Sequence, residues 1–238
     1  MIAAIWVPYG FSYNKTTMTG EWEDKLITEI ETPCDFNIRM TNMNNFAKDC
    51  MQLRKCGNLD CSNIKTLYST FENCSALEDM PLRNLGKVTN ARDTFRNCKA
   101  MKGSYSVPMP NLIYAERMFS GSGIEGWDFG GAKLRWKPED VIGGSVLKSL
   151  KGLDFYDVQE DDSYEMRWRS NYIETLEIKN IGIDFDFRGM PNLSKASIQY
   201  MYEKAKTNKQ ITWTYGSNNI AKWGSLPTGK SNIKWVRI

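Results

Sequence analysis

The feature that most constrains this chain is a phrase that returns at a fixed interval. The letters TFENCSAL, which start at Thr70, recur as TFRNCKAM from Thr94, 24 residues later. Cys50 precedes the cysteine of the first phrase, Cys74, by the same 24 residues. Self-similarity with a period of roughly 20 to 50 residues is typical of solenoids, in which each turn buries its apolar side against the next. The sequence therefore predicts a stack of similar turns.

Two apolar registers follow this interval. The first has the spacing i, i+3, i+7, which predicts one face of a short helical piece. Its copies are Ile64, Leu67 and Phe71; Val88, Ala91 and Phe95; and Leu112, Ala115 and Phe119. The second is an L-x-x-L-x-L pattern, whose last two positions alternate as in a strand. Its copies are Leu77, Met80 and Leu82; Met101, Ser104 and Ser106; Ile124, Trp127 and Phe129; Leu150, Leu153 and Phe155; and Ile173, Leu176 and Ile178. We expect Phe71, Phe95 and Phe119 to form one buried column, and the Asn73 and Asn97 amides to bond backbone groups in the turn.

The cysteines follow the interval rather than a pairing pattern. Residues at one register of a solenoid stack in its interior, so Cys50, Cys74 and Cys98 are expected to be buried free thiols. Cys56 and Cys61 could form a metal-binding pair, but no second pair and no histidine completes four ligands. Burial is therefore favoured for this pair as well, and neither a metal nor a cofactor is predicted.

The F-x-N-C-x-x-L phrase followed by L-x-x-L-x-L resembles the BspA-like leucine-rich repeats. These occur in bacterial surface proteins, in some protist surface proteins and in bacteriophage tail or fibre proteins. The strong match covers about Thr41 to Phe129, and a weaker one continues to about Phe187. The resemblance implies an α/β solenoid, a leucine-rich repeat stack of about 24-residue units with caps at both ends. It also implies recognition or scaffolding, because the family has no shared catalytic motif.

The chain divides into three parts on this interpretation: residues 1–40 form an N-terminal cap or docking segment, residues 41–187 the leucine-rich repeat solenoid and residues 188–238 a C-terminal cap. In the last part, Ser194 is a good N-cap for an amphipathic helix, and the segments QITWTYG and NIKWVRI favour β structure. The aromatic residues between Trp6 and Tyr13 favour packing on the first turn, with docking to a partner or a second copy as the alternative.

Candidate binding residues lie at the x positions of the strand pattern, which point away from the core and line one face of a solenoid. They are Glu78, Asp79, Lys102, Tyr105, Glu125, Asp128, Lys151, Asp154, Glu174 and Glu177. The face is predicted to be acidic, with a lysine line of Lys102 and Lys151, and suits a partner with basic groups or a polyhydroxylated glycan. A merely solvated face is the alternative.

A second candidate is the compact group of Arg167, Trp168 and Arg169. Arginine and tryptophan are enriched at the energetic centres of interfaces, so this group could contact a ligand or a partner. The favoured interpretation is nevertheless that Trp168 packs on the wall of the stack and that the arginines are solvated.

Composition narrows the function classes. The net charge is +3, with 31 basic and 28 acidic residues, and this balance argues against a dedicated nucleic-acid binder. No apolar run approaches the roughly 20 residues that a membrane helix needs. Histidine, the commonest general base, is absent. Paired acids such as Glu125 and Asp128 are more often solubilising charge than the catalytic pair of a glycosidase. We therefore expect a protein that is not an enzyme, without catalytic residues.

Two functions remain open. The first is a bacteriophage virion component, in the tail, a fibre or the capsid exterior, that uses its repeat face for protein or host-surface recognition and is assembled in the host cytoplasm. The start, MIAAIWVPYGF, lacks the basic segment and long apolar core of a secretory leader, which favours this hypothesis. The alternative is a bacterial cell-surface adhesin whose leader or anchor lies outside the sequence. Expected partners are other virion or surface proteins, or a host glycan or receptor, and homo-oligomerisation through the termini is left open.

Overall fold

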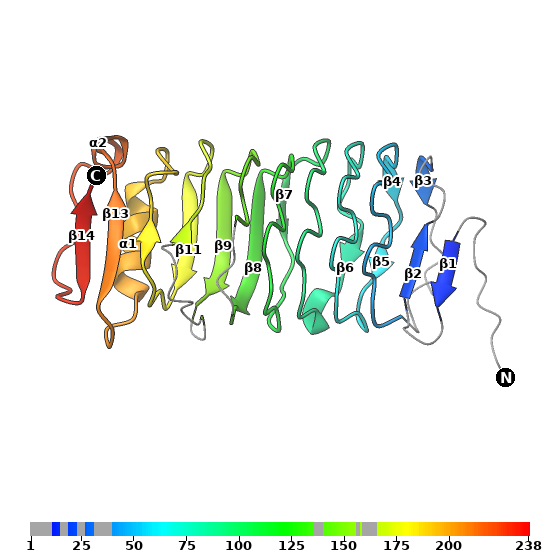
Figure 1. The fold of residues 1–238 in the computed structure, drawn as a ribbon, viewed down its shortest axis with the longest axis horizontal. Helices are drawn as coiled ribbons and strands as arrows, with labels where there is room; N and C mark the ends of the chain where they lie inside the picture. The colour runs from blue at the N-terminus through cyan, green and yellow to red at the C-terminus, as the bar shows by residue number, and fades with distance from the viewer. Residues whose placement is uncertain are drawn as a thin grey trace.

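The structure, a computed structural model, describes residues 11–14, 19–22, 27–30, 40–135, 140–155, 158 and 166–238. The chain winds into a parallel β-solenoid of about eight turns with few helices (Figure 1). The turns follow one another in chain order along the long axis, so that the last strand lies at one end of the molecule. The predicted solenoid is therefore confirmed.

Short strands join neighbouring turns. They are β1 (Phe11–Asn14), β2 (Thr19–Trp22), β3 (Glu29–Ile30), β4 (Lys55–Cys56), β5 (Leu59–Asp60), β6 (Leu82–Arg83), β7 (Ser104–Ser106), β8 (Gly126–Lys133), β9 (Ser149–Asp154), β10 (Met166–Arg167), β11 (Thr175–Lys179), β12 (Phe185–Asp186), β13 (Ile211–Tyr215) and β14 (Ile233–Arg237). One four-stranded parallel sheet has the order β11-β9-β8-β7, and a second has the order β10-β12-β13-β14. β3 pairs with β4 and β5 with β6, also in parallel, and within the described strands only the β1–β2 hairpin is antiparallel.

The segments that carry the first apolar register do not form the predicted helical pieces. Alternate amides from Leu67 to Asn73 donate to carbonyls 23 residues ahead, on the next turn, and the amides of Thr70 and Glu72 donate three residues back. Ser69 and Asn73 have φ values of 53° and 65°, which end any right-handed helix. Consecutive β-turns place side chains inward at spacings of three and four residues, and an α-helix produces the same spacings.

Residues with a left-handed backbone recur in two columns. The first column is Asn45, Ser69, Asp93, Arg117 and Asp140, and the second is Asp49, Asn73, Asn97, Gly121 and Gly144. Glycine is needed at position 121 for a second reason, since a Cβ there would lie 2.4 Å from Oδ1 of Asn97. The two columns mark bends in successive turns from Asn45 to Gly144, and apart from Arg117 they are occupied by glycine or short polar residues, which tolerate this backbone best.

The interior contains the predicted aromatic column. The ring centroids of Phe71 and Phe95 are 6.1 Å apart and those of Phe95 and Phe119 are 6.4 Å apart, with interplanar angles of 2° and 4°. Cys74 and Cys98 are fully buried beside this column, and their thiols donate to backbone carbonyls of the preceding turn. Cys50 is buried as well, so burial of all three thiols is confirmed.

The C-terminal part contains the predicted helix and β segments. Helix α1 (Lys195–Lys204) begins after Ser194, whose side chain accepts a hydrogen bond from the amide of Ser197. β13 and β14 continue the parallel stack, and a second helix, α2 (Ser217–Trp223), lies between them. A 3₁₀ turn, η1 (Leu85–Lys87), completes the described helical elements. Of the N-terminal aromatic residues, Phe11 and Tyr13 lie on β1, whereas Trp6 and Tyr9 lie outside the described residues, as does Cys34.

Candidate binding surface

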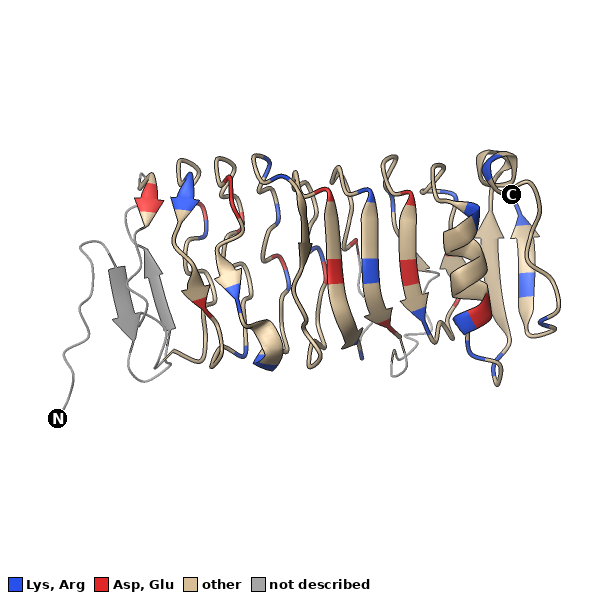
Figure 2. Cartoon of the chain, turned by 180° about the vertical axis from the view of Figure 1, so that it is seen from behind, with Lys and Arg blue, Asp and Glu red and all other residues tan. Residues whose placement is uncertain are grey.

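The sheet β11-β9-β8-β7 carries a row of alternating charge across its strands. Ser106 pairs with Asp128, and Asp128 pairs with Lys151. The Lys151 ammonium lies 3.2 Å from a carboxylate oxygen of Glu177 on β11. Figure 2 shows these acidic and basic bands in alternation across β8, β9 and β11. The row therefore holds two acids and one lysine, of which Lys151 and Glu177 compensate each other.

A second row runs parallel to the first at the start of the strands. The amide of Lys148 donates to the carbonyl of Glu125, and the amide of Glu174 donates to the carbonyl of Lys148. All three side chains are exposed. The sequence pattern missed Lys148 because it set the frame of β9 at Leu150, whereas Leu150 pairs with Trp127 and the matching copy begins three residues earlier.

The predicted lysine line does not form. β7 places Tyr105 opposite Trp127, with ring centroids 6.0 Å apart, so Tyr105 turns toward the core instead of outward. Burial raises the pKa of the Tyr105 phenol, in agreement with this position. Ser104 and Ser106 are exposed instead, because a slip of one residue exchanges the two faces of a strand. Lys102 is exposed but lies outside the row of Lys151.

The remaining strand-face candidates are divided between places. Asp154, half-buried on β9, accepts a hydrogen bond of 2.8 Å from the Asn180 amide. Glu78 accepts two hydrogen bonds from the Arg54 guanidinium, at 3.1 and 3.0 Å. Asp79 is exposed beside it. Glu78 and Asp79 precede β6, which pairs with β5 in a two-stranded sheet, so they do not join the four-stranded face.

The second candidate group keeps its tryptophan inside the stack. Trp168 is fully buried, with its ring edge-to-face against Phe155 at 6.5 Å and Phe185 at 5.9 Å. An indole in this position cannot meet a ligand, and the packing interpretation is correct for it. Arg169 is exposed, and the side chain of Arg167 lies outside the described residues.

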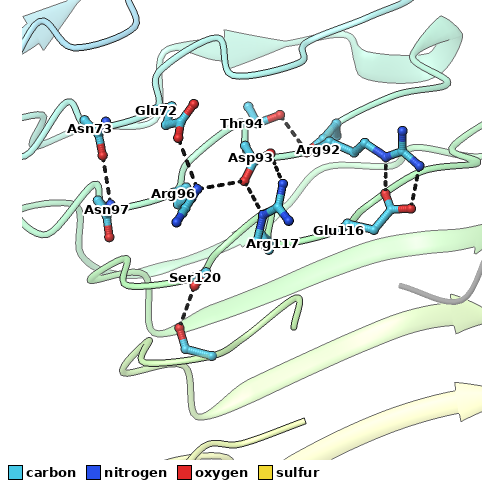
Figure 3. A network of polar contacts seen from close by, with 12 residues as sticks. Glu72, Asn73, Arg92, Asp93, Thr94, Arg96, Asn97, Glu116, Arg117 and Ser120 are labelled. Carbon is cyan, nitrogen blue, oxygen red and sulfur yellow. Dashed lines mark hydrogen bonds and ion pairs between the residues drawn. The ribbon is translucent and has the colours of Figure 1, made fainter. Parts of the chain in front are cut away.

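The turns between Lys48 and Ser120 carry a denser polar network (Figure 3). The Asp93 carboxylate, whose side chain is 2% exposed, accepts two hydrogen bonds of 2.8 Å from Arg117. Arg96 lies 3.7 Å from Asp93 and 3.3 Å from Glu72, and Lys48 lies 3.0 Å from Glu72. Hydrogen bonding to Asp93 raises the pKa of Arg117, and hydrogen bonding to Glu72 raises that of Lys48.

Asparagine side chains form a ladder beside this network. Asn97 Nδ2 donates to Asn73 Oδ1 at 2.8 Å, and Asn73 Nδ2 donates to Asp49 Oδ1 at 2.7 Å. The predicted bonds from these amides to turn backbone are wrong, because each amide meets its own equivalent on the preceding turn. Opposite charges 24 residues apart were the sequence signal for the neighbouring network, and they could have been found by comparing turns. Such pairs are Arg54 with Glu78, Lys48 with Glu72, Glu72 with Arg96, Arg92 with Glu116, and Asp93 with Arg117.

The pair Cys56 and Cys61 is buried, and burial raises the pKa of Cys61 to about 12. The Cys61 thiol donates to the carbonyl of Leu59 at 3.5 Å. A thiolate, which is the form that binds metals and attacks electrophiles, is therefore disfavoured here. In the part of the chain that the structure describes, no three His, Cys, Asp or Glu side chains are placed to hold a metal ion.

Comparison with protein families, with curated proteins and with solved structures gave no match. Among the described helices, none has both the length and the apolar character to cross a membrane. The role of the surface therefore has to be argued from the arrangement of its residues.

Proposed function

We propose that this chain acts by binding, as a non-enzymatic recognition or scaffold module of the BspA-like leucine-rich repeat type. The observation that carries this proposal is the sheet face on which Asp128, Lys151 and Glu177 alternate in charge across three strands. A stack of turns presents such a face rigidly over many residues, which suits contact with a large surface. Small-molecule sites, in contrast, are concave and mostly apolar.

We place this module in a bacteriophage virion, in the tail, a fibre or the capsid exterior. The buried thiols of Cys74 and Cys98, neither of which forms a disulfide, agree with assembly in a reducing cytoplasm. A bacterial cell-surface adhesin is the second candidate. The exposed hydroxyls of Ser104 and Ser106 beside the charged rows favour it, because such groups suit hydrogen bonding to a glycan.

Fractionation distinguishes the two locations. Lysed cultures of the source organism would be banded on a density gradient, and the chain followed by mass spectrometry in the particle band and in the cell-envelope fraction. We expect the chain in the particle band at a constant ratio to the major particle protein. Enrichment in the envelope, with cleavage by protease added to intact cells, would support the adhesin instead. A chain found in the soluble fraction alone contradicts both locations.

The role of the sheet face is tested by charge reversal. The variant Lys148→Glu/Lys151→Glu changes two cations of the face, and Lys65→Glu/Lys99→Glu changes two exposed cations in turns outside this sheet. Binding of the labelled full chain to host cells would be measured by sedimentation, after circular dichroism has shown that both variants fold. We expect the face variant to bind about tenfold more weakly, while the matched variant binds as the parent does. Equal binding by both variants would rule out this face.

A further inference from the structure

The modest net charge hides a strong asymmetry between the two ends. Residues 188–238 contain nine lysines and arginines and one acid, Glu203. The preceding 187 residues hold the other 22 basic and 27 acidic residues, so their net charge is −5 against +8 for the last part. Figure 2 shows basic segments on β14 and around it. The last turn is therefore the electropositive end of an otherwise acidic stack.

The last strand lies at the edge of its sheet. β14 is terminal in its sheet and pairs with β13 alone among the described strands. The carbonyl of Asn232 and the amide of Ile238 bond to β13. Because residues alternate in a parallel ladder, Lys234 and Val236 also face β13, and the main-chain groups of Ile233, Trp235 and Arg237 face outward. Three amides and three carbonyls are thus presented in strand geometry.

The side chains at this edge are only partly covered. Trp235 pairs with Trp213, and Val236 pairs with Thr214. Trp213 is 0% exposed and Thr214 is 3% exposed, whereas both partners on β14 are half-buried. Trp235 and Val236 are less covered than Trp213 and Thr214 because β14 is the last of the described strands in this sheet.

We propose that the outer edge of β14 is a docking site for an acidic, extended segment of another protein, which adds to this sheet as a further strand. The main-chain groups of Ile233, Trp235 and Arg237 would bond the added strand, and strand addition of this kind is a recurring mode of peptide recognition. Lys234 and Arg237 are exposed on the same strand, and within the described residues neither has an acidic partner. The site is separate from the charged sheet face, and it does not depend on where the chain is located.

Two other occupants fit this edge less well. A second copy that paired with β14 antiparallel about Trp235 would set Lys234 against Val236 and Arg237 against Ile233, so neither cation would meet an acid and two electropositive ends would be brought together. A nucleic acid would satisfy the cations, but its backbone cannot bond the amides of a strand edge in register. The acidic polypeptide is the occupant that satisfies both the charges and the main-chain groups.

Peptide binding to the full chain tests the proposal. The probe is an acetylated, amidated peptide of about ten residues, in which Val and Thr alternate with Glu, and its counterpart carries Lys in place of Glu. Affinity would be measured by isothermal titration, and amide protection by hydrogen exchange with ¹⁵N NMR. We expect the acidic peptide to bind at least about tenfold more tightly than the basic one. On binding, the amides of Ile233, Trp235 and Arg237 should gain protection, while those of Lys234 and Val236 are already protected.

Variants separate the charge from the edge. Lys234→Glu/Arg237→Glu should weaken binding of the acidic peptide about tenfold, whereas the matched Lys65→Glu/Lys99→Glu should leave it unchanged. Arg237→Pro removes an outward amide and should bind more weakly than Arg237→Ala, because proline is tolerated at an edge but cannot donate. Equal affinity for both peptides, no new protection at the three amides, tighter binding of an oligonucleotide, or dimerisation through β14 would each overturn the proposal.

Discussion

Two regions of the stack bury their interiors in different ways. In the regular region, residues 41–121, successive turns are joined by bridges from Asn42 to Thr66 to Asn90 to Tyr114, each step being 24 residues. In the strand region, residues 126–238, the steps vary. Gly126 pairs with Ser149 and Ser149 with Thr175, which are steps of 23 and 26 residues.

This difference shows that the regular region requires the same residue at equivalent positions, whereas the strand region requires only an apolar residue. In the regular region, side chains contact their own equivalents, as in the Asn73–Asn97 bond and the Phe71–Phe95 stack. In the strand region, rings of different kinds meet at varied angles, 72° between Trp168 and Phe185 and 20° between Tyr202 and Trp235, and backbone ladders hold the turns together. There, apolar character suffices, and the period is free to drift.

The largest expected effect is in the aromatic column. Phe95→Ala removes the central ring of three and should lower the free energy of unfolding by about 3–5 kcal/mol, because the rigid neighbours cannot fill the cavity. Urea unfolding measures the loss. Adding Phe71→Ala should give a coupling of about 0.5 kcal/mol or more, whereas adding Phe187→Ala in the strand region should be additive. Additivity in both double variants would remove the distinction between the regions.

The buried carboxylate comes next. Asp93→Asn keeps the size of the side chain and its tolerance of the left-handed backbone, but weakens the two bonds from Arg117. We expect a loss of about 2–3 kcal/mol, the range for hydrogen bonds to charged groups. The matched change is Asp154→Asn on β9, in the strand region, where the aspartate is half-buried. It should lower the free energy of unfolding by less than about 1 kcal/mol. Equal losses in urea unfolding would show that the regular region gains nothing from its polar network.

A smaller effect is expected at the bend. Gly121→Ala should cost about 1–2 kcal/mol, from its positive φ and from contact with the Asn97 side chain. In an Asn97→Ala background the contact disappears, so the cost of the glycine change should fall. Gly224→Ala is the strand-region control, because its φ is +75° and nothing lies within 4 Å of the added carbon. Thermal unfolding would be compared for Gly121→Ala, Asn97→Ala, the double variant and Gly224→Ala. If Gly121→Ala lowers stability equally with and without the Asn97 side chain, the contact with Asn97 does not matter.

The smallest effect is expected on the sheet face. Lys151→Ala should change the free energy of unfolding by less than about 1 kcal/mol, because its ion pair with Glu177 is partly exposed and screened. A double-mutant cycle with Glu177→Ala measures the pair itself. A coupling above about 1 kcal/mol would mean that this row holds strands together as the network of the regular region does.

The sequence predicted those features that are built from the same residue repeated on successive turns. The 24-residue interval, the column of Phe71, Phe95 and Phe119 and the burial of Cys74 and Cys98 all follow from it, and the structure contains them. The helical pieces were wrong because paired β-turns and a helix share inward spacings of three and four residues. Only hydrogen bonds between turns distinguish them, and these have no local sequence signal.

The register of the sheet face was harder to predict. Leu147, Leu150 and Leu153 lie three residues apart and are all buried, so two frames of the strand pattern fit equally well. On β7, Tyr105 stands between two serines, and small polar residues do not indicate which side faces inward. An error in deciding which strand residues face the core also misplaces the candidate binding residues, because the residues between them are taken to face outward.

The bridge that runs through Asn42, Thr66, Asn90 and Tyr114 also makes the length of the molecule adjustable. Removing the 24 residues from Thr66 to Thr89 would join two equivalent points of the spiral and shorten it by one complete coil, while both ends keep their neighbours. Duplication or loss of that 24-residue unit in the gene would therefore change the distance between the electropositive end and the opposite end of the molecule by one turn.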